Sequence, residues 1–280
     1  MMSTRLSILA LILLLFSSGC IEPFSFTPDE PVELLVVDGL IDQSDGPYEL
    51  KLSRTSAFGE PPELIQDAQI TIYDNQGQLE NYFSVRPGVY QVNGDVVRGE
   101  PGRTYYIENQ VDGQTYQSQP QTMPRLIQAD SAYFETGVET IVSEQGNSTE
   151  DILINVYVDT PTKRQDQNAY FRWLYDVTYA VIQPDCGPFI PRRTCFITET
   201  TNTQNITLFS SENTATNQLS KFLVATDDTR PQYAFSIRYY VNIYQFSITP
   251  EAYQYWADVK TIANQEGTIF DAPPAPIRGN

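Results

Sequence analysis

The chain has 280 residues, with 35 acidic and 17 basic side chains, a formal charge of −18 and no histidine. Nucleic acid is not an expected partner, because binding phosphates depends on clustered cations. The lack of histidine excludes Ser-His-Asp and Cys-His catalysis, histidine-bound zinc and a histidine pH switch. Carboxylate-pair catalysis, Ser-Lys chemistry and carboxylate-bound calcium remain open, and the length predicts two domains.

The first twenty residues have the layout of a bacterial lipoprotein signal. A single charge at Arg5 precedes an apolar run over residues 6–16, and small residues lead into Cys20. As a helix this run rises only about 16 Å, too little to cross about 30 Å of hydrocarbon. The sequence therefore predicts a signal peptide over residues 1–19, cleaved before a lipidated Cys20, and a lipidated tether over residues 20–31. The alternatives are an ordinary signal peptide with an incidental cysteine and an apolar N-terminal core helix.

Residues 32–122 consist of short alternating segments separated by glycine, proline, asparagine and aspartate. This pattern predicts an antiparallel β-sandwich of the immunoglobulin-like or fibronectin-like type. The clearest hairpin is expected across Asp112-Gly113. The expected strands are residues 33–37, 48–52, 69–73, 88–92, 104–108 and 114–118.

A second, β-rich domain is expected over residues 123–280, after a linker at residues 120–124. Together with the first domain it makes the predicted fold mostly β, with two β-sandwich domains of the immunoglobulin-like or fibronectin-like type and one C-terminal α-helix. Polar loops are expected at residues 143–149 and 210–216. The expected strands are residues 129–135, 152–159, 170–181, 195–201, 219–225 and 233–246.

A single helix is expected over residues 250–265. Thr249 offers an N-cap, Pro250 suits the first helical position, and Glu251 places an acid at the positive end of the helix dipole. The apolar face passes through Trp256 and is expected to cover the sheet, so Trp256→Ala is expected to cost about 3–5 kcal/mol. A rigid, proline-rich tail follows the helix.

The two remaining cysteines, Cys186 and Cys195, lie close together in the sequence. Export would place them in an oxidising compartment, so we expect a disulfide that closes the base of a proline-containing loop. The alternative, a thiolate metal site, lacks further soft ligands in a chain without histidine.

Aromatic residues are the most informative candidates for a binding surface. The segment 233–246 carries large side chains on both faces, of which one must be core and the other must pack on the helix, the first domain or a partner. A partner surface including Phe189, Tyr239 and Tyr244 is the functional interpretation, and core packing is the alternative. Acidic loops at residues 42–46 and 227–228 are more typical of turns than of calcium sites, so no metal, cofactor or catalytic residue is predicted.

Several motifs follow one another along the chain after Cys20. They are Leu35-Val36-Val37-Asp38-Gly39-Leu40-Ile41, Gly46-Pro47-Tyr48, Lys51-Leu52-Ser53-Arg54-Thr55, Pro101-Gly102, Tyr170-Phe171-Arg172-Trp173, Thr249-Pro250-Glu251-Ala252-Tyr253, Phe270-Asp271 and Arg278-Gly279-Asn280. In this order they resemble the DUF4249 family of Bacteroidota outer-membrane lipoproteins. The resemblance implies an outer-membrane lipoprotein, often associated with genes for TonB-dependent transporters, and implies no known catalytic residues.

Members of this family usually continue past the Arg-Gly-Asn motif into a further strand, whereas this chain stops at Asn280. The resemblance therefore leaves two expectations open. One is a sheet edge that is available to a partner, and the other is a truncated gene.

Together these patterns predict an outer-membrane, lipid-anchored protein that binds rather than catalyses. The expected role is that of an accessory to a TonB-dependent transporter or an envelope assembly, with partner binding in residues 125–280 rather than in the acidic first domain. One alternative is a structural or adhesive surface lipoprotein. Another is a carboxylate-dependent glycan hydrolase, which requires two facing acids.

Overall fold

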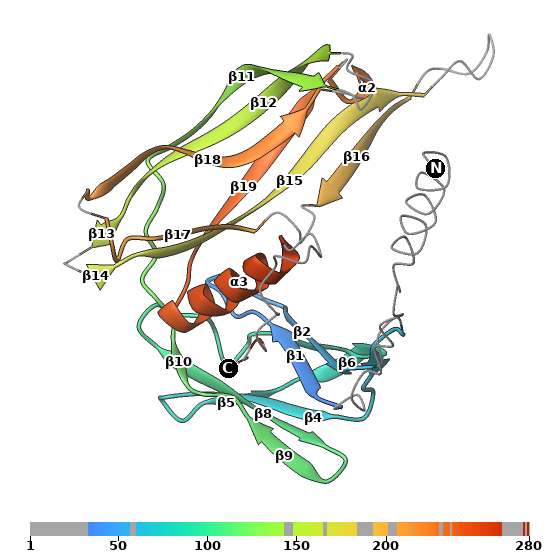
Figure 1. Ribbon diagram of the computed structural model, residues 1–280. Coiled ribbons are helices and arrows are strands. Elements are labelled where there is room, and N and C mark those ends of the chain that lie inside the picture. The colour runs from blue at the N-terminus through green and yellow to red at the C-terminus, as the bar shows by residue number, and fades with distance from the viewer. Residues whose placement is uncertain are drawn as a thin grey trace, which may run out of the picture.

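The computed structural model describes most of the chain after residue 32. The described residues are 33–56, 60–142, 148–164, 167–183, 193–200, 206–214, 216–229, 232–235, 237–264, 277 and 279. Over these residues the protein is mostly β, built from several antiparallel sheets and one long helix near the C-terminal end (Figure 1). The predictions of a mostly β fold and of a C-terminal helix are confirmed.

Residues 35–122 form two five-stranded sheets. The first sheet has the order β1-β2-β7-β6, with β3 paired to β2, and the second has the order β10-β8-β4-β5, with β9 paired to β8. In chain order the strands are β1 (Leu35–Gly39), β2 (Tyr48–Arg54), β3 (Glu63–Leu64), β4 (Gln69–Asp74), β5 (Leu79–Asn81), β6 (Phe83–Arg86), β7 (Val89–Val92), β8 (Thr104–Val111), β9 (Gln114–Gln117) and β10 (Gln121–Thr122).

The first and second sheets pack face to face because alternate residues of their strands are apolar. Leu50 and Leu52 of β2 are buried against Ile70 of β4 and Val111 of β8, and Tyr48 packs near Ile72 in a second cluster. Burying each such aliphatic side chain contributes about 1.5–3 kcal/mol. This alternation explains why most of these strands could be read from the sequence.

Residues 131–247 form a second group of sheets, in the upper half of Figure 1. The third sheet has the order β11-β12-β18, and in the fourth sheet β15 pairs with β16 and β17 along one edge and with β19 along the other. The strands are β11 (Ser131–Val142), β12 (Ser148–Pro161), β13 (Lys163–Arg164), β14 (Gln167–Asn168), β15 (Tyr170–Ile182), β16 (Thr194–Thr200), β17 (Thr207–Ser210), β18 (Gln218–Asp228) and β19 (Tyr239–Ser247).

An aromatic core joins the third and fourth sheets. Phe171 and Trp173 of β15 are 0% and 1% exposed, and they pack with Val158 of β12 and Val224 of β18. The indole of Trp173 lies 4.9 Å from the ring of Phe222, centroid to centroid. This core lies on the inner face of β15, so the opposite face remains available to the helices.

Helix α3 (Pro250–Ala263) contacts that outer face, where it packs against β15 and β17. The Oγ1 atom of Thr249 accepts the amide of Ala252 at 3.2 Å, as expected for an N-cap. The Trp256 ring centroid lies 3.4 Å from the guanidinium carbon of Arg172. No residue of α3 is fully buried, so Trp256 is a half-buried stacking partner rather than the core residue that the sequence predicted.

Two expected segments differ from the structure. The expected strand at residues 233–246 begins with a short helix, α2 (Gln232–Phe235), and β19 starts only at Tyr239. The turn brings the rings of Phe235 and Tyr239 to 4.3 Å, a contact that an extended chain cannot make. The expected linker at residues 120–124 contains β10, whose pairing with β8 is strengthened by a 2.8 Å hydrogen bond between the hydroxyls of Thr104 and Thr122.

Glu80 on β5 holds the loop after β7 and should make the stability depend on pH. Its carboxylate accepts the amides of Gly94, Asp95, Val96 and Val97 at 2.9–3.3 Å. Burial opposes the charged form, but these four hydrogen bonds lower the pKa of Glu80 below its ordinary value of 4.5. The stability that the charged form contributes is therefore complete above about pH 4.5 and is lost as the pH falls through the lowered pKa.

Urea unfolding between about pH 3 and pH 6 measures this dependence. The wild-type midpoint should fall at the acidic end, and Glu80→Gln should be less stable at pH 6 with a flatter profile. The control is Glu60→Gln, a change at an exposed position. Equal slopes for wild type and Glu80→Gln would contradict this role.

Candidate functional site

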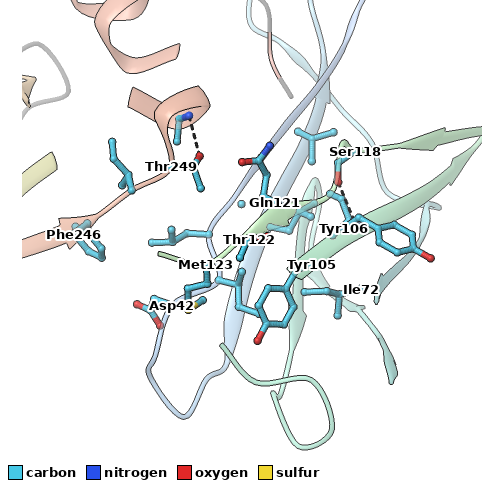
Figure 2. A pocket seen from close by; sticks show the side chains of 18 of the residues that line it. Asp42, Ile72, Tyr105, Tyr106, Ser118, Gln121, Thr122, Met123, Phe246 and Thr249 are labelled. Atoms are coloured by element: carbon cyan, nitrogen blue, oxygen red, sulfur yellow. Dashed lines mark hydrogen bonds between the residues drawn. The ribbon is translucent and has the colours of Figure 1, made fainter. Parts of the chain in front are cut away.

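A pocket of about 760 Å³ lies where the first two sheets meet the end of β19 and the beginning of α3. Figure 2 shows Gln121 and Thr122 between Phe246 and Thr249 on one side and Tyr105 on the other. Residues of β1, of β8 to β10 and of the β19–α3 corner form its three walls. Pockets at the junction of structural units are common ligand sites.

The first wall is β1, an edge strand of the first sheet. Leu35, Val37 and Gly39 line the pocket, while the alternate residues Val36 and Asp38 point to the other face. Burial lowers the pKa of the Arg172 guanidinium on β15, and the negative charge of Asp38 opposes part of this shift. The charged Asp38 of β1 therefore lies near enough to the fourth sheet to act on Arg172.

The loop after β1 is held by a close backbone approach. A Cβ atom at Gly99 would lie 1.8 Å from the carbonyl oxygen of Asp42, so only glycine fits there. The Tyr48 hydroxyl accepts the amide of Gly99 at 3.2 Å and donates to the carbonyl of Ser44 at 2.7 Å. These contacts fix residues 40–44 at the rim of the pocket.

The second wall is built by β8 and the two strands that pair in tandem along its edge. The β8–β9 hairpin turns at Asp112 and Gly113, both with positive φ, which confirms the expected hairpin. Ile107 and Asn109 lie at alternate positions of β8 and line the pocket, as does Tyr116 of β9. The outer edge of β9 and β10 pairs with no other strand in the described part of the chain.

The third wall is rigid because its polar groups are engaged within the protein. Gln245 donates from Nε2 to the carbonyl of Ile127 at 2.9 Å and to Oγ1 of Thr160 at 3.1 Å. Its Oε1 atom accepts the indole N–H of Trp173 at 2.9 Å. Gln245 is therefore a positioning residue for this wall.

The lining of the pocket is close to neutral. Among its described residues Asp42 is the only carboxylate, and none is a lysine or an arginine. The Oδ1 atom of Asp42 accepts the amide of Ser44 at 2.9 Å. Burial raises the pKa of the Tyr82 phenol, with a further contribution from Glu80, and burial also raises the pKa of Tyr105. Both phenols are therefore neutral near pH 7, and the lining presents no pair of facing acids.

Asn109 is a buried lining residue whose amide oxygen is unpaired in the described part of the chain. It is 2% exposed, and its Oδ1 atom has no hydrogen-bond partner among the described residues. Leaving a buried acceptor unpaired costs about 1–3 kcal/mol, which a ligand with a hydrogen-bond donor would recover. The sequence carried a signal for this residue, because a polar Asn109 stands between Ile107 and Val111 at the inward positions of a strand.

The two tyrosines that the sequence proposed for a partner surface, Tyr239 and Tyr244, do not line this pocket, whereas Asp42 of the acidic loop at residues 42–46 does. Cys20, Cys186 and Phe189 lie outside the described residues. Cys195 lies at an exposed position on β16, and because its proposed partner is outside the described part, the disulfide stays a prediction.

The two tyrosines proposed for a partner surface lie on opposite faces of β19. Tyr239 donates its hydroxyl to Oδ2 of Asp227 at 2.8 Å, and burial raises the pKa values of both groups. Tyr244 is 47% exposed and donates to Oδ2 of Asp176 at 2.9 Å. Only Tyr244 is well placed for a partner, and its role there stays a prediction.

The acidic loops show no metal site in the described part of the chain, which contains no group of three or more potential ligands among Asp, Glu, Cys and His. Asp42 and Asp227 serve local hydrogen bonds instead. Within the same described part, no helix has the length and apolar character needed to span a bilayer.

Comparison with known proteins gives one match. A family model described as a domain of unknown function, DUF4249, matches residues 21–280. No curated protein and no solved structure matches the chain.

Proposed function

The chain belongs to the DUF4249 family, and from that premise we propose that it is an outer-membrane lipoprotein, lipidated at Cys20, that binds a ligand in the pocket between β1 and the β19–α3 corner. The lipid anchor is supported by the apolar run and the small residues before Cys20. The ligand is uncharged, because the lining offers one carboxylate and no cation among its described residues.

The single observation that carries the binding function is Asn109. Its buried amide oxygen has no hydrogen-bond partner in the described part of the chain and lines a pocket of about 760 Å³. The unpaired acceptor destabilises the free protein, and a ligand with a hydrogen-bond donor would remove this destabilisation. The same lining argues against a glycan hydrolase, since that chemistry uses two carboxyl groups on either side of the substrate.

We further infer that residues 32–122 and 123–280 are two β-sandwich domains of the immunoglobulin-like or fibronectin-like type. Support comes from the face-to-face packing of the sheets in each group. In the described ranges, no strand of one group pairs with a strand of the other. The pocket would then lie at a domain junction.

The biological role that we propose is an accessory to a TonB-dependent transporter or an envelope assembly. The alternative is a structural or adhesive surface lipoprotein. It is favoured by Tyr240 and Tyr244, which are 42% and 47% exposed on the outer face of β19. Whether a β-barrel transporter co-purifies with the protein separates the two roles.

Filling the pocket tests the binding function. Val37→Trp places an indole in the pocket, whereas Val36→Trp places the same group on the opposite face of β1 as a matched control. The full-length protein is purified from membranes in mild detergent, and bound molecules are identified by native mass spectrometry. Wild type and Val36→Trp should carry the same ligand, and Val37→Trp should lose about tenfold or more of it.

An identical set of bound molecules on all three proteins would contradict the pocket as the binding site. Protein that carries no ligand in any of the three forms would favour the structural or adhesive alternative.

A further inference from the structure

We propose that the ligand of this pocket is an extended, uncharged segment of a partner protein that pairs with β1 as an added strand. This inference rests on the proposed function and names the class of ligand. It follows from the hydrogen-bonding pattern of β1, the lining beside it and the buried amide of Asn109.

The ladder between β1 and β2 shows which backbone groups of β1 are used. The carbonyl of Leu34 accepts the amide of Thr55 at 2.9 Å, which makes these two residues a hydrogen-bonded pair. Two residues opposite each other in an antiparallel ladder alternate between bonded and non-bonded pairs. Val37 and Leu52, three positions further along, are therefore a non-bonded pair.

The other contacts of Leu52 give the same result independently. Its amide donates to the carbonyl of Gly88 at 2.8 Å, and its carbonyl accepts the amide of Ile65 at 3.2 Å. Both backbone groups of Leu52 thus point away from β1. The N–H and C=O groups of Val37 consequently point to the open edge of β1.

By the same alternation, Leu35 and Gly39 also direct their N–H and C=O groups to the open edge. None of these three residues has a backbone partner in the described part of the chain. The same three residues line the pocket. A strand laid along this edge would satisfy the unpaired groups and place its alternate side chains in the pocket.

The edge has none of the usual protection against strand addition. β1 has the sequence Leu-Val-Val-Asp-Gly, without proline, lysine or a bulge, and it is exposed over most of its length. Its single charge, at Asp38, belongs to the face away from the pocket. The five residues of β1 extend about 17 Å, so a partner segment of similar length fits.

The pocket also specifies the side chains of the partner strand. Inward side chains would meet Leu50, Ile72 and Ile107, so they are apolar. One inward serine, threonine, asparagine or glutamine would supply a donor for Oδ1 of Asn109. A charged inward side chain is disfavoured, because burying a charge is costly without a partner of opposite charge and Asp42 at the rim is the only charged residue among the described residues of the lining.

The test removes one edge donor while it preserves the ladder with β2. Val37→Pro deletes an N–H group that β2 does not use, and proline is tolerated where the N–H of an edge strand faces outward. Val37→Ala is the matched control, since it shortens the same side chain and keeps the N–H group. The probes are terminally blocked, fluorescein-labelled peptides in which threonine alternates with valine, leucine or serine, and binding to the full chain is measured by anisotropy.

We expect Val37→Pro to weaken the tightest of these peptides by about tenfold or more and Val37→Ala by less than about threefold. Amide exchange measured by NMR on the wild-type protein gives a second readout that does not depend on a variant. The peptide should slow exchange at Val37 and Gly39 and leave Val36 and Asp38 unchanged, because the last two already bond to β2.

Equal weakening by the two variants, or protection without this alternation, would overturn strand addition while the binding function stands. Strand addition would also be overturned by a second result, in which native mass spectrometry finds a small molecule in the pocket and no probe peptide binds the protein. If the chain self-associates and Val37→Pro abolishes this self-association, the edge binds a second copy of the chain. That result would overturn the proposal that the added strand comes from a different protein. The proposed function itself fails only in the separate comparison of Val37→Trp with Val36→Trp.

Discussion

Replacing Trp173 with alanine should lower the free energy of unfolding by about 3–5 kcal/mol, the range for emptying a large aromatic site. The side chain is 1% exposed and packs against the rings of Phe171 and Phe222 at centroid distances of 5.4 Å and 4.9 Å. Its indole N–H also donates to Gln245, which lines the pocket. The variant should therefore lose ligand affinity together with stability.

The matched control is Trp256→Ala, the same substitution on α3. Trp256 is only half-buried, and its main contact is the stacking of Arg172, so the expected loss is about 1 kcal/mol. Urea unfolding followed by circular dichroism measures both variants. Losses of equal size would mean that α3 contributes as much as the core between the third and fourth sheets, which would contradict the structure.

The contrast between these two tryptophans shows what the sequence could and could not predict. The start of α3 was predictable, because Thr249 and Pro250 act through local contacts within the first turn. The burial of its apolar face was not, because it depends on how the helix sits on β15, a strand distant in the sequence.

Strands were predictable where one face is buried. β2 and β4 alternate apolar and polar residues, and the structure places both within two residues of the expected bounds. The short strands β5 and β10 carry no such pattern. They are strands because β4 and β8 offer them a ladder, a relation that a single segment does not encode.

The pocket, like the short strands, could be predicted only in part from the sequence. The inward position of Asn109 could be inferred from the alternation of β8. Its lack of a partner could not, since that depends on which groups of distant strands come within hydrogen-bond distance of it. The functional residues that the sequence favoured were aromatic and C-terminal, whereas most of the pocket lining comes from residues 35–126.

Cys20→Ala should move the protein from the membrane fraction to the soluble fraction, or stall it as an unprocessed precursor. A diacylglyceryl group and an N-acyl chain at Cys20 would supply the anchor, at about 0.8 kcal/mol for each buried CH₂ group. The body of the protein adds little attraction of its own, because a chain with a formal charge of −18 is repelled by anionic lipids. Nearly all of the membrane association should therefore depend on this one residue.

Fractionation combined with intact mass measurement tests this prediction, and Cys195→Ala is the matched control. The control removes a cysteine at an exposed position of β16 and should leave both the mass shift from lipidation and the membrane association unchanged. The mass distinguishes a released mature chain from a precursor that is held in the membrane by residues 1–19. A Cys20→Ala protein that is correctly processed and still membrane-bound would contradict the lipid anchor.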